Sequence, residues 1–127
     1  IGGIIHTEML VILKKVVGKK RISNAEIRWR GVPNPDLTTF WKSMQNFLDG
    51  TPGRAIVLGL QGYHDHWTVI EKITSRSILL YDSALIKRLP RSSCTTVYAT
   101  WQRKHILLPA QTYFLSNDDI NIGQYDI

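Results

Sequence analysis

The chain has 127 residues, of which 43% are hydrophobic and 20% are charged, and its formal net charge is +6. This length and composition indicate one globular domain over 1–127, and they exclude a spanning helix, because no stretch reaches the roughly 18 uncharged apolar residues that such a helix requires. The single cysteine, Cys94, excludes an internal disulfide framework and a thiolate-rich zinc site, so we expect it to be a small core residue.

Helical periodicity dominates the first part of the chain, and we expect a helical part at about 1–50. Apolar residues recur at three- and four-residue spacing over 4–17, which predicts a first helix there. Residues 19–33 are compatible with a short helix or an edge strand. A second helix is predicted after Asn34 as the N-cap and Pro35 in the first turn. Its expected buried face comprises Leu37, Phe40, Trp41, Met44, Phe47 and Leu48.

The pattern becomes strand-like from residue 54, and we expect a sheet part at about 54–116. The first run is almost continuously apolar, as is typical of a strand covered on both faces. A polar break at 74–76 between two apolar runs predicts an antiparallel hairpin, and Pro109 marks an edge or a bend. The expected strands are 54–60, 66–73, 77–82, 95–101, 104–109 and 111–116. The predicted fold class is α+β, with N-terminal helices packed against an antiparallel sheet.

The hairpin carries polar residues at the ends of its strands, and a metal site is one interpretation of them. His64 and His66 share one strand face and, with Glu71, partly resemble the cupin metal motif. A regular strand would turn Glu71 to the opposite face, and no second motif with a third histidine follows. We therefore expect no metal and no cofactor.

A base and its orienting carboxylate are the second interpretation of the hairpin. A three-residue loop at 74–76 would pair Thr68 with Asp82 and set His66 diagonally beside Asp82 on the same face. A two-residue loop would put His66 and Asp82 on opposite faces. Ordinary turn chemistry, in which Asp82 and Ser83 bond their own backbone, is the alternative that involves no catalysis.

Residues 62–83, GYHDHWTVIEKITSRSILLYDS, resemble the His–Asp half of papain-like cysteine peptidases, and most of all the double-glycine, bacteriocin-processing branch. The resemblance implies a papain-like fold, a bacterial source and a hydrolase with a catalytic Cys-His-Asp triad. It implies that His66 is the general base and that Asp82 orients it. It also implies a cleft that takes a peptide or protein, and the residues expected to line that cleft are Gly3, His64, Asp65, Trp67 and Ser83.

The chain departs from this family at the nucleophile. The family's Cys-Gly motif falls on Gly2 and Gly3, and Cys94 follows His66 and Asp82 instead of preceding them. Either Gly2 replaces the cysteine, naturally or by design, or the cysteine lies upstream, or the domain is a pseudoenzyme that binds without cutting. A thiolate is essential to the papain route, so no hydrolysis is expected of the chain as written.

The basic balance of the chain suggests a third class of function. Basic residues gather at 14–21, 28–30, 87–91 and 103–104, which raises nucleic-acid binding as an alternative. This alternative is not favoured, because the interleaved stacking aromatics of a known module do not accompany the charges. The sequence shows no signal-peptide pattern, so the expected location is cytoplasmic or inside another cell after delivery, and the compartment is left open.

Overall fold

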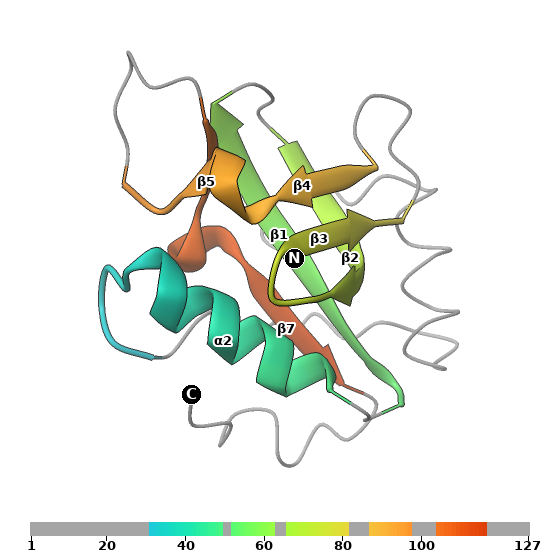
Figure 1. The fold of residues 1–127 in the computed structure, drawn as a ribbon. Helices are drawn as coiled ribbons and strands as arrows, with labels where there is room; N and C mark the ends of the chain where they lie inside the picture. Colours follow the sequence, from blue (N-terminus) through green and yellow to red (C-terminus); the bar gives the residue numbers. More distant parts are fainter. Residues whose placement is uncertain (1–30, 50–51, 63–65, 82–86, 98–103, 117–127) are drawn as a thin grey trace.

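The computed structural model describes residues 31–49, 52–62, 66–81, 87–97 and 104–116. In this part of the chain it shows a mixed α+β fold of one α-helix and a seven-stranded sheet (Figure 1). The helix predicted over 4–17 lies outside the described residues. The elements are α2 (Leu37–Leu48), β1 (Arg54–Gly62), β2 (His66–Ile73), β3 (Ser77–Leu80), β4 (Arg88–Pro90), β5 (Cys94–Thr95), β6 (His105–Leu107) and β7 (Tyr113–Ser116), with 3₁₀ turns η1 (Arg91–Ser93) and η2 (Pro109–Gln111).

Helix α2 begins two residues later than its sequence predicts. The carboxylate of Asp36 accepts a hydrogen bond from the Thr39 N–H at 2.7 Å, and this contact lowers the pKa of Asp36 from its ordinary value. Asp36 has the extended backbone that an N-cap requires, whereas Asn34 has a φ of 50°. The prediction of Asn34 as the cap is therefore wrong, because that residue adopts the left-handed conformation before the helix starts.

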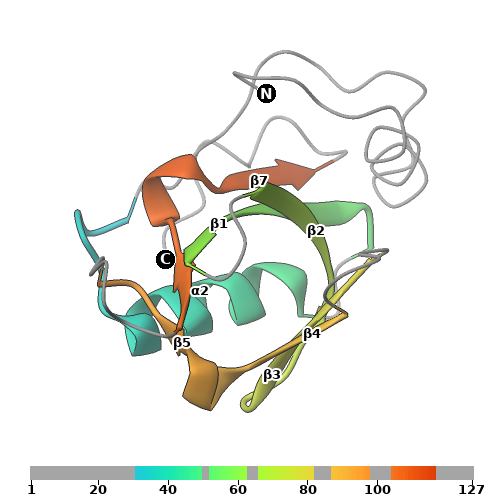
Figure 2. The ribbon, with the colours of Figure 1, turned by 90° about the horizontal axis from the view of Figure 1, so that it is seen from above.

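The strand order is β4-β3-β2-β1-β6-β5, and β7 pairs with β1 off this path. The two outermost strands of this order, β4 and β5, are joined by only the three residues of η1. So short a connection brings the two edges of the sheet together, and Figure 2 shows the strands following a curve around the core. Helix α2 packs against β1 and β2.

The sheet is mixed, which corrects the prediction of an antiparallel sheet. Strands β5 and β6 are parallel, with Cys94 opposite His105 and Thr95 opposite Ile106. Strand β5 follows β4 through η1 and pairs with β6 at the other end of the strand order. It therefore does not reach β6 through a hairpin, which would make the pair antiparallel. All other pairs are antiparallel among the described strands.

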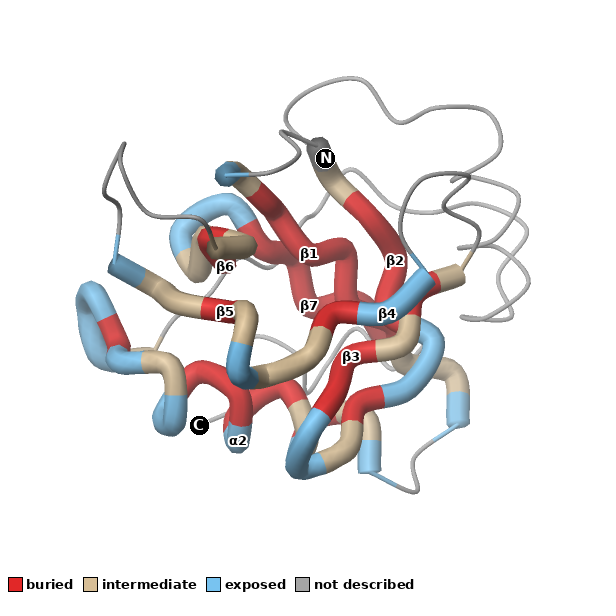
Figure 3. The backbone as a smooth tube through the Cα atoms, turned by 45° about the horizontal axis from the view of Figure 1, so that its top comes forward, coloured by how far each residue is buried: buried red, intermediate tan, exposed pale blue. Residues whose placement is uncertain are grey.

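The core lies inside the curve of the sheet, where the apolar face of α2 meets the inner faces of the strands (Figure 3). Phe40, Trp41, Met44 and Phe47 of α2 are completely buried. Every residue from 55 to 60 of β1 is also buried, which confirms the prediction of a strand covered on both faces. Cys94 is 3% exposed, so the prediction that it is a core residue is confirmed as well.

Strand β1 bonds to two strands along one edge, with η2 between them. Leu60 pairs with Leu107 of β6 and Val57 pairs with Tyr113 of β7. The buried hydroxyl of Thr112 bridges the interruption, since it accepts from the Gly59 N–H at 3.3 Å and donates to the Leu108 carbonyl at 2.8 Å. Pro109 begins η2, so the predicted bend is confirmed.

One predicted strand is mostly not formed, and one observed strand was not predicted. In the described part of 95–101 only Thr95 is in a strand, and the exposed Val97 has left the sheet. Strand β4 (Arg88–Pro90) was not predicted because it lies in a cluster of basic residues. Only one of its side chains, that of Leu89, is in the core, so the strand shows no apolar run. The described part of the chain contains no helix of the length and apolar character that a membrane span requires.

Candidate active site

His66 is the first residue of β2, and its backbone pairs with Leu60 of β1. Along the same strand Thr68 pairs with Leu58, and both Thr68 and Ile70 are buried. Because side chains alternate along a strand, position 66 lies on the inner face that these residues share. The backbone therefore places the proposed base at the end of the core-facing row of β2.

The turn between β2 and β3 decides between the two loop lengths that the sequence left open. Ile73 pairs with Ile78, and the Thr74 N–H donates to the Ser77 carbonyl at 2.9 Å, which leaves Ser75 and Arg76 at the tip. The hydroxyl of Thr74 also accepts from the N–H groups of Arg76 and Ser77, at 3.3 and 3.1 Å. Of the two loops that the sequence left open, the two-residue turn is therefore the one that forms, and the Thr74 side chain closes it.

A β-bulge in β2 then changes the register of the hairpin. Lys72 pairs with Leu79 but Ile70 pairs with Leu80, so Glu71 is an extra residue on β2. The ladder continues in the new register, because the Tyr81 N–H donates to the Val69 carbonyl at 3.0 Å.

Beyond the bulge the register is the one that the base-and-carboxylate hypothesis requires. A three-residue loop without a bulge would produce the same pairing of Ile70 with Leu80. The sequence contains a signal for the bulge that strict two-residue alternation does not take into account. Ile70 and Ile73 are both core residues although they are three positions apart, and the two residues between them are exposed. In a regular strand, residues three positions apart would lie on opposite faces.

Most of the other predicted site residues lie outside the part of the chain that the structure describes, and the side chain of His66 is also not described. These residues are Gly2, Gly3, His64, Asp65, Asp82 and Ser83.

Trp67 is described, and its contact is structural. It pairs with Gly59 across the β1–β2 ladder, on the face opposite to that of position 66. Its indole N–H donates to the Gln111 carbonyl at 3.0 Å, which holds η2 against the sheet. Gly59 leaves room for this packing, since a Cβ there would lie 3.0 Å from both the Cβ and the carbonyl oxygen of Gln111.

Cys94 has the properties of a structural thiol. Its Sγ donates to the Pro90 carbonyl at 3.3 Å, and burial raises the pKa of the thiol to about 12, against a smaller opposing effect of the Lys104 charge. A thiol with so high a pKa supplies almost no thiolate near neutral pH. The one cysteine of the chain is therefore not a substitute for the missing nucleophile.

His105 is a half-buried residue that the sequence did not single out. It pairs with Cys94 of β5 and with Gly62 of β1, and it shares its strand face with Leu107. Because Leu107 pairs with the same Leu60 that pairs with His66, positions 105 and 66 lie on one face of the sheet. The alternation of His105 with Leu107 in the sequence was the available signal.

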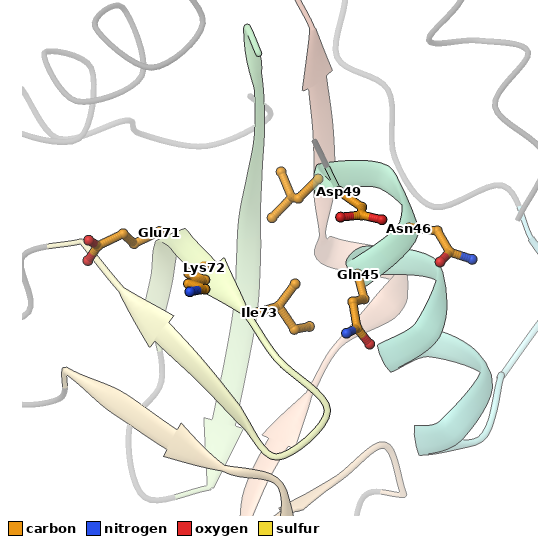
Figure 4. Close-up of a pocket in the computed structure, with 7 residues that line it drawn as sticks. Gln45, Asn46, Asp49, Glu71, Lys72 and Ile73 are labelled. Carbon is orange, nitrogen blue, oxygen red and sulfur yellow. The ribbon is translucent and has the colours of Figure 1, made fainter. Parts of the chain in front are cut away.

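A pocket of about 290 Å³ lies between the C-terminal end of α2 and the bulge of β2 (Figure 4). It is at the opposite end of β2 from His66, so it does not belong to the proposed dyad. Within the described residues, no group of three His, Cys, Asp or Glu side chains is arranged to hold a metal ion. The pocket is lined by Gln45, Asn46, Leu48, Asp49, Glu71, Lys72 and Ile73.

No family model matches this chain, and no curated protein and no solved structure matches it either. What the chain can do is therefore inferred from its own residues.

Proposed function

We propose that the chain is a papain-like domain of the cysteine peptidase type, with His66 as the general base and Asp82 as the residue that orients it. The observation that carries this proposal is the register of β2 against β3, in which Ile70 pairs with Leu80 and Val69 bonds Tyr81. The mixed α+β fold agrees with it at the level of the fold class.

Continuation of this register by one residue would set Asp82 opposite Thr68. His66 is two residues before Thr68 on the same face, so its imidazole would be diagonal to the carboxylate and within side-chain reach. A carboxylate that accepts from one imidazole nitrogen fixes the tautomer and leaves the other nitrogen to take a proton. This is the task of the base in an acyl transfer from an amide.

The nucleophile of this proposed site belongs near Gly2, where the chain has no thiol. A cysteine at the start of a helix and beside His66 would have a lowered pKa and would attack an amide carbonyl. Without it, binding of a peptide or protein in the same cleft is the second candidate function. The burial of Cys94, with its raised thiol pKa, favours this binding function for the chain as written.

Restoring the nucleophile tests the proposal. The variant Gly2→Cys, in a Cys94→Ala background, is treated with a peptidyl vinyl sulfone, which alkylates a thiolate placed beside a general base. We expect labelling of the new cysteine at least about tenfold faster than labelling of the same variant carrying His66→Ala, because the imidazole generates the thiolate. Intact mass spectrometry measures the labelled fraction.

The matched control moves the thiol away from the site. Lys42→Cys in the same background carries an exposed cysteine on α2 and should react at one rate with or without His66. If folded Gly2→Cys reacts no faster than this control, or reacts equally well without His66, the peptidase-type site is wrong.

A further inference from the structure

The β3–β4 hairpin carries a basic surface that the proposed active site does not use. In the described segments 74–81 and 87–97, every charged residue is basic, and these residues are Arg76, Lys87, Arg88 and Arg91. Arg76, Lys87 and Arg88 are exposed, and no ion pair joins them to an acidic residue in the described part of the chain. Lys87 and Arg88 lie at the start of β4 and Arg76 lies in the turn before β3, where its carbonyl bonds the Arg91 N–H, so these three neighbouring cations attract an anionic partner.

Arg91 has a structural role that separates it from the other three. Its guanidinium lies over the ring of Trp41 at 5.3 Å and donates to the Ser75 carbonyl and the Thr38 hydroxyl at 3.3 and 3.2 Å. These contacts fasten the hairpin to α2. Arg91 therefore supports the surface, and the exposed residues Arg76, Lys87 and Arg88 form it; we call these three the basic edge.

Arg88 is the best oriented member of the basic edge. Its Nε donates to the hydroxyl of Ser77 at 2.9 Å, and Ser77 is itself buried. This bond fixes the plane of the guanidinium, and the remaining N–H groups make no hydrogen bond with other described residues. A fixed fork of donors suits a carboxylate, which accepts two parallel bonds.

The backbone of β4 adds a second feature. On either side of β4, the Leu80 N–H donates to the Lys87 carbonyl and the Arg91 N–H donates to the Arg76 carbonyl, so Lys87, Leu89 and Arg91 are the residues that face β3 and the turn before it. The N–H and C=O of Arg88 point the other way, toward the outer edge, where no described strand pairs with β4. A peptide can use both the donor and the acceptor, whereas a phosphate backbone has only acceptors and is repelled by the carbonyl.

We propose that the basic edge binds an extended, acidic segment of a partner protein, which adds to the sheet beside β4. Main-chain bonds at Arg88 align the segment, and the carboxylates on one face of the segment meet Arg88, while the charges of Lys87 and Arg76 add a longer-range attraction. The proposal is independent of the nucleophile and of the His66 site.

Fluorescence anisotropy with a labelled peptide of six Glu-Val repeats tests the proposal, because alternation lets all the glutamates lie on the strand face of Arg88. The wild-type chain should bind this probe with an affinity that falls steeply as salt is raised. Arg88→Glu should weaken binding by about tenfold or more, whereas Lys42→Glu, the same charge reversal at an exposed site on α2, should change it by no more than about twofold.

Two competing probes complete the test. The same peptide with N-methylated valines cannot donate main-chain bonds and should bind at least about fivefold more weakly, if strand addition holds. A twelve-nucleotide oligothymidylate should bind more weakly than the peptide. Equal binding by the N-methylated peptide, tighter binding by the oligonucleotide, or an unchanged affinity in folded Arg88→Glu would each overturn the proposal.

Discussion

Gly62 shows how much a single residue determines at the end of β1. Its φ is +96°, a backbone conformation that residues with a Cβ adopt only with strain. A Cβ at this position would also overlap the Lys104 carbonyl oxygen. The absence of the side chain lets Gly62 pair with His105 of β6. The proposed base, His66, follows four residues after Gly62 in the sequence.

Replacement of Gly62 by alanine should lower the free energy of unfolding by about 2 kcal/mol or more, because backbone strain and overlap with the Lys104 carbonyl add together. Urea denaturation followed by tryptophan fluorescence measures the change. Gly53→Ala is the control for backbone strain alone, since Gly53 also has a positive φ, of 75°. An equal or smaller loss for Gly62→Ala would contradict the contact with Lys104.

The β2–β3 hairpin shows that two local irregularities together determine which residues share a face. The two-residue turn at Ser75 and Arg76 alone would place positions 66 and 82 on opposite faces, and the extra residue Glu71 reverses that outcome. Trp41 stabilises the turn, because its indole N–H donates to the Thr74 carbonyl at 2.7 Å. Helix α2 therefore contributes to the geometry of the hairpin from the other layer.

Deletion of Glu71 should be tolerated, although it removes a residue from within a strand. Lys72 would follow Ile70 directly in a regular ladder, and each remaining residue would keep its partner and its face. We therefore expect a change in stability of less than about 1 kcal/mol. Chemical denaturation and a ¹H–¹⁵N spectrum check this expectation.

Deletion of Val69 is the matched control for the deletion of Glu71. Val69 is 2% exposed and lies in the regular part of the ladder, so its removal would turn residues 66–68 to the opposite face. We expect a loss of more than about 3 kcal/mol or no folded protein. Similar stabilities of the two deletion variants would show that Glu71 is not a bulge.

At the scale of the whole molecule, the described part of the chain is a curled sheet that α2 closes, with contacts between distant segments. Phe47 meets Phe114 of β7 edge to face, with ring centroids 5.1 Å apart, and the Thr96 hydroxyl donates to the Pro35 carbonyl at 2.9 Å. Arg91 joins α2 to the hairpin at the other side of the core. Such closure indicates that the interior opens only when much of the fold is lost.

Cys94 reports on this closure. We expect no measurable reaction of the native chain with a disulfide reagent at about pH 8 over an hour, and one reactive thiol per chain in denaturant, because the thiol is buried and its pKa is raised to about 12. Cys94→Ser should show no reaction in either condition. Rapid reaction of the native wild type would contradict the burial and would reopen the question of a nucleophile.

The same thiol makes stability depend on pH in the alkaline range. Its pKa is higher in the folded chain than the ordinary value of 9.0, so the folded state holds the proton more tightly. This contribution is fully present below about pH 9 and declines as the pH rises toward 12. The decline in the denaturation midpoint over this range should be smaller in Cys94→Ser.

The elements that could be predicted from the sequence are those with strong local patterns. The apolar stripe of α2, the double-sided burial of β1 and the bounds of β2 follow from periodicity and composition alone. Strand β4 and the parallel pairing of β5 could not be predicted, because short strands such as Cys94–Thr95 carry too few residues for a period to show. Their places depend on partners that are distant in the sequence.

The same division holds for the candidate site. The sequence by itself determined the residue types, namely an imidazole and a carboxylate at the ends of adjacent strands and the absence of a thiol near Gly2. The register was decided only by the tertiary structure, because the turn at Thr74 and the bulge at Glu71 depend on hydrogen bonds and burial across the sheet. A difference of one residue in that register reverses a strand face, and counting residues along the chain does not reveal which residue the ladder leaves out.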